Sequence, residues 1–154
     1  QWRGQEIPGL RYDITIIEPK MLGKEFAKTK GHRHTNNAPE LYKVLEGETY
    51  YFFQKGDKNE IKDAYIIKVK AGEFALIPSE PYDHLTINPS SENRLVMSNW
   101  LSPDCQNDYT FFEKMQGACY YYTTEGWIKN PNYAKIPELR FEEPLKEMPK
   151  DFKG

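Results

Sequence analysis

The stretch from Thr29 to Gly47, TKGHRHTNNAPELYKVLEG, carries two of the three histidines of the chain. A single residue separates His32 from His34, and Glu40 follows after a loop that contains two asparagines and a proline. On a β-strand, residues i and i+2 point to the same face, so both imidazoles are expected on one side, within reach of one metal ion. The loop lets the chain turn back and bring Glu40 toward that side. The stretch therefore predicts a metal chelate.

The third histidine, His84, lies far downstream and must come from another strand. A single histidine in a strand is more often hydrogen-bonded or solvated than bound to metal. Here, however, all three histidines of the chain join one pattern with an acidic residue. Three neutral imidazoles and a carboxylate suit one divalent transition metal (Fe, Mn, Ni, Co or Zn) and leave two positions open if the ion is octahedral. The predicted ligands are His32, His34, Glu40 and His84.

Short strand-like runs, separated by Gly, Pro, Asn and Asp, flank this stretch on both sides, which is typical of an all-β sandwich or barrel. Their Val, Ile, Tyr and Phe residues favour single strands over 11–17, 64–70, 73–77, 84–88 and 93–101. Two hairpins are also expected. One covers 40–57 and turns at Gly47, and the other covers 117–130 and turns at Glu125 and Gly126. Apolar stripes with a helical period are absent, so no helix is expected in the middle of the chain.

The C-terminal tail, 136–154, is rich in proline and charge. Such a segment is expected to be an extended arm or a partly disordered end, and it could cover a sheet edge or cross to a partner subunit. We therefore expect one domain over 1–135 and an extended arm over 136–154.

The composition limits which kinds of partner and which cellular compartment are expected. A chain of 154 residues is one domain of ordinary size, and its net charge of -2 supplies no basic field for nucleic acid. No apolar run is long enough to span a membrane, so no membrane partner is expected. The two cysteines, Cys105 and Cys119, lack the spacing of a disulfide framework and are expected to be reduced, in a cytoplasmic protein.

Two spaced motifs resemble those of the cupin superfamily. His32-x-His34 with Glu40 and Gly47 resembles the first motif, and the second is matched by Gly72, Pro78, His84 and Asn88. Within the cupins, GKEFAKTKGHRH (23–34) followed by ELYKVLEG (40–47) resembles the metal-dependent phosphoglucose isomerase family of archaea and some bacteria. The resemblance covers about Leu10 to Tyr109. It implies a double-stranded β-helix, or jelly-roll barrel, that interconverts glucose 6-phosphate and fructose 6-phosphate in glycolysis and gluconeogenesis.

The resemblance also assigns roles to residues. It implies metal ligands at His32, His34, Glu40 and His84, phosphate binding at Thr15, Thr29, Lys30 and Gly31, and catalytic roles for Glu40 and Tyr42. Its ligand is a sugar phosphate, and fold analogy implies a homodimer. A carboxylate held by a metal is a poorer base than a free one, so proton transfer by Glu40, by Tyr42 or by a water all stay open.

This chain departs from the family pattern downstream of the last ligand. In WLSPDCQNDY (100–109), Asp108 and Tyr109 are kept, but Asn107 stands where the family has a histidine, and Leu101 or Trp100 stands where it has a tyrosine. Those positions are expected to touch the substrate.

Two other functions remain open. A cupin dioxygenase could use the same ligands to hold Fe(II), although the Thr-Lys-Gly phosphate stretch argues against it. A non-catalytic cupin that binds sugar or metal is favoured by the replaced histidine. Without the resemblance, Lys30 would be a solvated surface residue and Thr15 an ordinary strand former.

Overall fold

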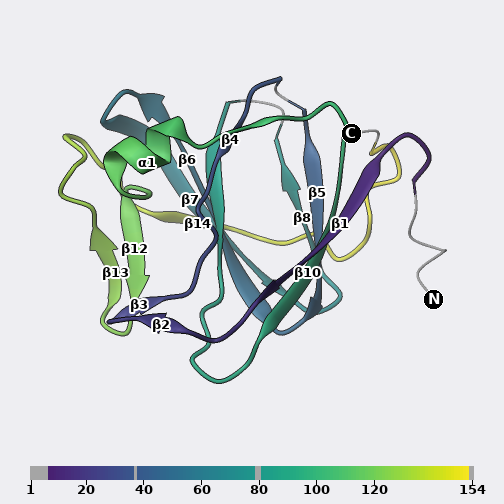
Figure 1. The fold of residues 1–154 in the computed structure, drawn as a ribbon, viewed down its shortest axis with the longest axis horizontal. Helices are drawn as coiled ribbons and strands as arrows, with labels where there is room; N and C mark the ends of the chain where they lie inside the picture. Colours follow the sequence, from purple (N-terminus) through teal and green to yellow (C-terminus); the bar gives the residue numbers. More distant parts are fainter. Residues whose placement is uncertain (1–6, 37, 79–80, 153–154) are drawn as a thin grey trace.

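The computed structural model describes residues 7–36, 38–78 and 81–152, and two four-stranded sheets dominate it. The first sheet has the order β1 (Arg11–Ile17), β10 (Leu95–Leu101), β5 (Glu40–Glu46) and β8 (Phe74–Ile77). The second has the order β14 (Arg140–Glu142), β7 (Glu60–Lys70), β6 (Glu48–Asp57) and β9 (Asp83–Ile87). All neighbouring strands are antiparallel except β14 and β7, which are parallel. The sheets form the two walls of a barrel (Figure 1).

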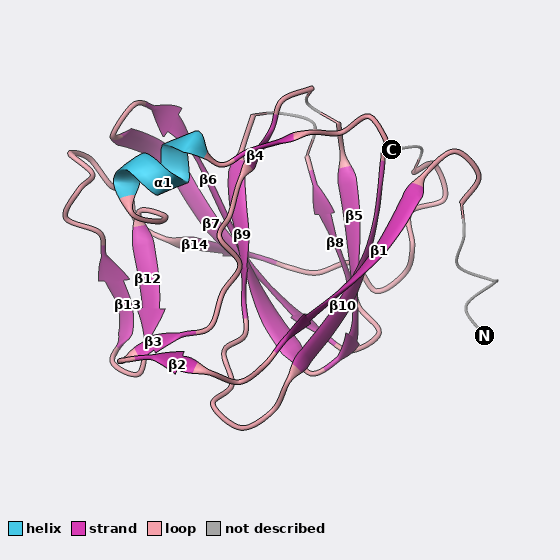
Figure 2. Cartoon of the chain, in the orientation of Figure 1, coloured by secondary structure: helices cyan, strands magenta, loops and turns pink. Residues whose placement is uncertain are grey.

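The remaining elements attach to this barrel (Figure 2). A third sheet has the order β13 (Gly126–Lys129), β12 (Tyr120–Thr123), β3 (Glu25–Phe26) and β2 (Met21–Leu22). A two-stranded ladder joins β4 (Arg33–His34) to β11 (Asn107–Asp108), and a short helix, α1 (Thr110–Met115), follows it. The all-β prediction is confirmed. Among the described residues, no helix has the length and apolarity to cross a membrane.

Aromatic and aliphatic side chains from both walls fill the barrel. Alternate residues of each strand point inward, so Tyr51 and Phe53 of β6 meet Tyr42 and Val44 of β5 in one buried cluster. The ring centroids of Tyr42 and Tyr51 are 4.7 Å apart, in a stacked arrangement. Burial of large rings carries much of the stability here, because each ring removes a large apolar area from water.

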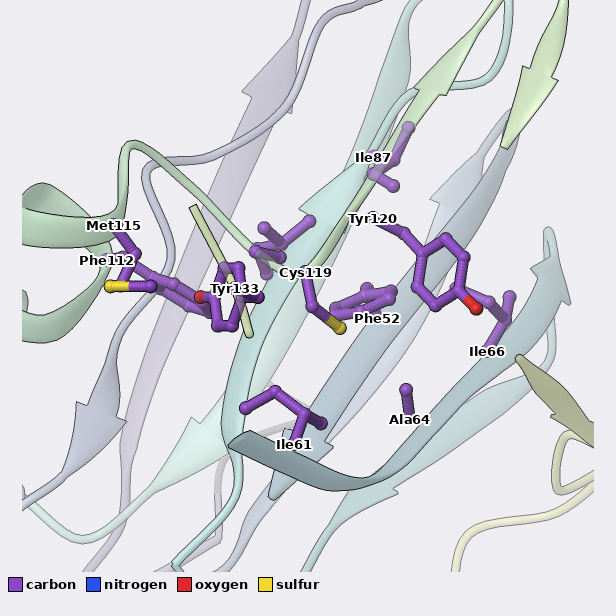
Figure 3. Packing of buried hydrophobic residues seen from close by; sticks show 12 residues of the cluster. Phe52, Ile61, Ala64, Ile66, Ile87, Phe112, Met115, Cys119, Tyr120 and Tyr133 are labelled. Atoms are coloured by element: carbon purple, nitrogen blue, oxygen red, sulfur yellow. The ribbon is translucent and has the colours of Figure 1, made fainter. Parts of the chain in front are cut away.

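A second core covers the outer face of the β6–β7–β9 wall. Phe52 and Ile66 point away from the barrel and pack against Phe112 of α1 and against Cys119 and Tyr120 from the later part of the chain (Figure 3). The wall is therefore buried on both faces, which explains why β9 is buried at every position.

The predicted hairpin at Gly47 is wrong. Strand β5 pairs with β10 and β8, whereas β6 pairs with β7 and β9, so Gly47 is the corner at which the chain passes from one wall to the other. Its φ is +85°, and a Cβ there would lie 2.6 Å from the carbonyl oxygen of Arg94. The hairpin partner of β6 is β7, which begins at Glu60, earlier than predicted. The turn signal was correct, but local sequence does not say which strand pairs with which.

The other strand predictions are confirmed within a few residues, and the predicted hairpin of β12 and β13 is present but turns at Thr124 and Glu125, one residue earlier than expected. The predicted corner from Pro78 to Pro81 includes Ser79 and Glu80, which lie outside the described residues, as does Asn37. Helix α1 was not predicted, because its six residues are too few to show a helical period.

The C-terminal segment lies along a sheet edge. Strand β14 adds a parallel strand to β7, and Leu145 exchanges two backbone hydrogen bonds with Phe74 of β8 in the opposite wall. Both oxygens of Asp63 accept hydrogen bonds from Arg140 at 2.8 Å. The segment thus covers edges that would otherwise present unpaired backbone groups.

Candidate metal centre and its pocket

The four predicted ligands come from both walls of the barrel and from the segment that leads into β5. His32 and His84 exchange both backbone hydrogen bonds, at 3.0 and 2.9 Å, so the segment that ends in β4 is tied to β9. Glu40 is the first residue of β5, in the opposite wall. Pairing across the sheets therefore brings together residues that are far apart in the sequence.

The ligand atoms of these four residues all lie within 4.8 Å of one another. Oε1 of Glu40 is 3.3 Å from Nε2 of His34 and 3.6 Å from Nε2 of His84. These atoms and Nδ1 of His84 are buried, yet none of them has a hydrogen-bond partner. Buried polar atoms without a partner cost free energy, and a cation between them would satisfy them together. The buried cluster could hold a metal ion.

The position of the proton on the His34 ring is also suited to metal binding. Its Nδ1 lies 2.9 Å from the carbonyl oxygen of Ala38. Because a carbonyl can only accept, Nδ1 carries the proton and Nε2 is left with a lone pair that faces Glu40. Metal-binding histidines generally fix their second nitrogen in this way, which orients the ring.

Protonation of the centre follows from burial and from the neighbouring charges. Burial, together with His84 and His34, lowers the pKa of His32 to about 3, against the opposing effect of Glu40. Burial opposes ionisation of Glu40, but His34 and His84 outweigh it and lower the pKa of the carboxyl to about 2. Burial likewise opposes protonation of His34, but the neighbouring Glu40 outweighs it, and the pKa of His34 is raised above its ordinary value. A metal ion would therefore compete with a proton for this ring.

An ion pair beside the ligands ties the two histidine-bearing segments together. Arg33 donates to both oxygens of Asp83, from Nε at 2.7 Å and from Nη2 at 3.1 Å. Each partner is adjacent in sequence to a ligand histidine, and Asp83 is buried. A bidentate pair with a buried carboxylate is geometrically specific, so it fixes the position of β4 relative to β9.

A pocket of about 260 Å³ opens onto the centre. Its lining includes every residue to which the sequence assigned a role except His34, which is buried: Thr15, Thr29, Lys30, Gly31, His32, Glu40, Tyr42 and His84. The structure thus brings the predicted metal and phosphate residues into one cavity.

Three of the predicted phosphate residues are constrained by other parts of the protein. Thr29 accepts a hydrogen bond from the backbone N–H of Thr86 at 3.0 Å, so its hydroxyl proton is still available to a ligand. The ammonium of Lys30 pairs with Glu113 of α1. Gly31 has a φ of +84°, and a Cβ on it would lie 2.6 Å from the ring of Phe112, so a structural requirement for glycine exists at this position.

Sequence reasoning assigned no site role to several pocket residues: Arg11, Asp13, Leu85, Thr86, Met97 and Asn99. Strand periodicity could have found some of them, since Arg11 and Asp13 share a face with Thr15. Asn99 was also detectable in principle, because asparagine is unfavourable inside a strand and calls for a reason.

The departures from the family pattern lie at this pocket. Leu101 lines it, whereas Trp100 belongs to a buried cluster with Leu41 and Phe74. Of the two candidates for the position of the family tyrosine, Leu101 is therefore the one at the site. Asn107 and Tyr109 also line the pocket, and the Asn107 side chain donates to the Tyr109 hydroxyl at 3.2 Å.

The two facing walls and the His/Glu cluster at one end of the barrel define the class of protein, which is a cupin. The family model described as "Glucose-6-phosphate isomerase (GPI)" matches residues 3–138. The chain belongs to this family.

Individual relatives agree with the family at low identity. The chain is 32% identical over 108 residues to a glucose-6-phosphate isomerase of Pyrococcus furiosus, covering 68% of this chain and 53% of that protein. It is 28% identical over 110 residues to a glucose-6-phosphate isomerase of Pyrococcus abyssi, covering 65% of this chain and 50% of that protein. The chain spans about half the length of these relatives.

Solved structures of similar shape include a vicilin from Capsicum annuum, with a TM-score of 0.49 and 17% identity over 69% of this chain and 26% of that one. An oxalate oxidase has a TM-score of 0.47 and 20% identity over 66% of this chain and 45% of that one.

Proposed function

We propose that this chain is a metal-dependent aldose–ketose isomerase that interconverts glucose 6-phosphate and fructose 6-phosphate or a closely related pair. One divalent transition metal (Fe, Mn, Ni, Co or Zn) is held by His32, His34, Glu40 and His84. The observation that carries the proposal is the set of buried, unpartnered nitrogen and oxygen atoms that face one another in a chain of the isomerase family. Membership of the family supports the activity, and the unpartnered atoms support the metal.

The reaction moves a hydrogen between C1 and C2 of an open-chain sugar, and its obstacle is the weak acidity of a carbon next to a carbonyl. The bound ion would supply Lewis-acid stabilisation of the enediolate charge. The protein supplies ligands that are held in place before the substrate arrives.

Tyr42 is a hydrogen-bond donor in this pocket. Burial raises its pKa well above the ordinary value, and the charge of Glu40 adds to this effect. The hydroxyl therefore keeps its proton at neutral pH, so it is suited to donate a hydrogen bond to a substrate oxygen, and neither to release that proton nor to act as a base. Its ring is stacked on Tyr51, which fixes the direction of the hydroxyl.

The phosphate would bind where Thr15, Thr29, Lys30 and Gly31 line the pocket. Hydroxyl and ammonium donors suit a phosphate dianion. Lys30 would have to turn from Glu113, an exposed partner, and surface pairs of this kind contribute only about 0–1 kcal/mol.

The test is conversion of fructose 6-phosphate to glucose 6-phosphate by purified protein. The rate is measured after EDTA treatment and after Mn, Fe, Ni, Co or Zn is added back in turn. Turnover that EDTA removes and one ion restores supports the proposal and names a competent metal. Stoichiometric metal binding without conversion of any sugar phosphate would contradict the isomerase while leaving the metal centre intact.

A non-catalytic cupin that binds sugar or metal is the second candidate. It is favoured by the apolar Leu101 at the pocket wall, which offers no hydrogen bond to a reacting sugar. In that case sugar phosphates would bind with measurable affinity by calorimetry, and no turnover would follow with any of the ions.

We also propose a homodimer located in the cytoplasm. Strand β1 is the end strand of its sheet, and Ile14 and Ile16 on it are 47% and 53% exposed, an apolar edge that a second copy would cover. The two buried, unpaired cysteines suit a reducing compartment. Light scattering of the wild type and of Ile16→Glu tests the dimer, because a monomeric wild type would contradict it.

A further inference from the structure

Asn99 occupies an unusual position for its residue type. It lies in the middle of β10, is only 5% exposed, and points into the pocket between Met97 and Leu101. Asparagine is depleted in strand interiors, and burying an amide without a partner costs free energy. A buried asparagine in this place therefore needs a strong hydrogen-bond partner.

That partner is the ligand carboxylate. Nδ2 of Asn99 donates to Oε2 of Glu40 at 2.6 Å, a short distance that is typical of a hydrogen bond to a charged acceptor. Asn99 is directly opposite Tyr42 on β5, and Glu40 is two residues farther along the same face. Diagonal neighbours of this kind are about 7–8 Å apart at the backbone, which is within reach of two polar side chains.

The two oxygens of Glu40 are thereby separated into different roles. Oε2 is held by Asn99, whereas Oε1 faces Nε2 of His34 and of His84 and has no hydrogen-bond partner. A carboxylate whose rotation is fixed in this way presents a single oxygen to an ion among the histidines.

We propose that Asn99 is a positioning residue that commits Glu40 to the metal through one oxygen, Oε1. This inference rests on the metal centre of the proposed function and extends it. With Oε1 directed to the ion and Oε2 already engaged by an amide donor, Glu40 is a poorer proton acceptor than a free carboxylate. Its part in the reaction is that of a fixed ligand.

The first test compares Co²⁺ binding by apo-protein of the wild type, Asn99→Leu and Asn99→Gln. Leucine has the same branching at Cγ as asparagine but is bulkier and has no donor, so Oε2 is released, and loss of such a supporting partner typically weakens metal binding about 10- to 100-fold. The visible spectrum of the bound Co²⁺ should also change, because the released oxygen can join the coordination sphere. Glutamine keeps a donor and should restore part of both properties.

Ser98→Ala is the matched control. Ser98 is the neighbouring residue of β10, is equally buried, and points to the other face, where its hydroxyl has no hydrogen-bond partner. Its removal should leave Co²⁺ affinity and spectrum unchanged. The inference would be overturned by an Asn99→Leu variant that is folded, as judged by circular dichroism, and that binds Co²⁺ like the wild type.

A crystal structure of the Mn²⁺-loaded wild type decides the question if Asn99→Leu does not fold. One Glu40 oxygen on the ion with the other still on Asn99 supports the inference, and both oxygens on the ion overturn it. A wild type that binds neither Co²⁺ nor Mn²⁺ at stoichiometric levels would instead refute the metal centre itself.

Discussion

Gly31 should be one of the least tolerant positions near the site, because glycine is required there for two independent reasons. Its φ of +84° is a left-handed conformation that costs an L-residue about 1–2 kcal/mol. A Cβ would also lie 2.6 Å from two ring carbons of Phe112, and relief of such overpacking typically costs about 1–3 kcal/mol. Gly31→Ala should therefore destabilise the protein by about 2–5 kcal/mol.

Thermal unfolding followed by circular dichroism measures this effect. For a chain of this size, about 1 kcal/mol lowers Tm by roughly 2–4 °C, so the expected fall for Gly31→Ala is about 4–20 °C. Gly72→Ala is the matched control, because its φ is +91° but no atom lies within 4 Å of the added Cβ. Only the conformational cost of about 1–2 kcal/mol applies to it.

A double-mutant cycle separates the two causes. Phe112→Ala is destabilising on its own, but it removes the ring that an alanine at Gly31 would meet. The double variant should be more stable than the sum of the single effects predicts by about 1–3 kcal/mol. Equal losses for Gly31→Ala and Gly72→Ala, together with no coupling to Phe112, would refute the close packing of α1 on this loop.

Three further changes have definite expected outcomes. His84→Ala should abolish stoichiometric metal binding, as measured by metal analysis after dialysis, and should abolish turnover with it; full activity would remove His84 from the centre. Thr29→Val should raise KM for a phosphorylated sugar far more than for the unphosphorylated one, and an equal rise for both would contradict phosphate binding at Thr29. Arg140 lies beside Asp63 and lowers the pKa of that carboxyl below its usual value of 3.8. The ion pair therefore stabilises the fold fully above pH 3.8, and this stabilisation is lost as the pH falls through the lowered pKa. The difference in Tm between the wild type and Asp63→Asn should accordingly be constant near neutrality and shrink below about pH 4; a difference that does not change with pH would mean that the pair contributes nothing.

The residues of the candidate centre could be anticipated from the sequence because part of their signal is local. The alternation of a strand places His32 and His34 on one face, and a chain with three histidines leaves His84 as the natural third member. The strands were equally accessible, since β-branched and aromatic runs between turn residues report a pleated, half-buried surface. The structure brings these residues within reach of one another.

Pairing and packing between distant segments could not be predicted in the same way. The φ of Gly47 fits a hairpin or a corner, and only the separate partners of β5 and β6 show that it is a corner. Helix α1 is too short to carry a period, and its position depends on Phe112 meeting Gly31 from a remote part of the chain.

The sequence by itself indicated which residues could form a metal centre and where most of the strands run, because ligand chemistry and strand alternation are properties of residues and their near neighbours. Only the tertiary structure decided that Leu101 rather than Trp100 lines the pocket and that Asn99 holds Glu40. Those facts depend on the register between β5 and β10, which is set by long-range hydrogen bonding and by burial of both sheets around a shared core.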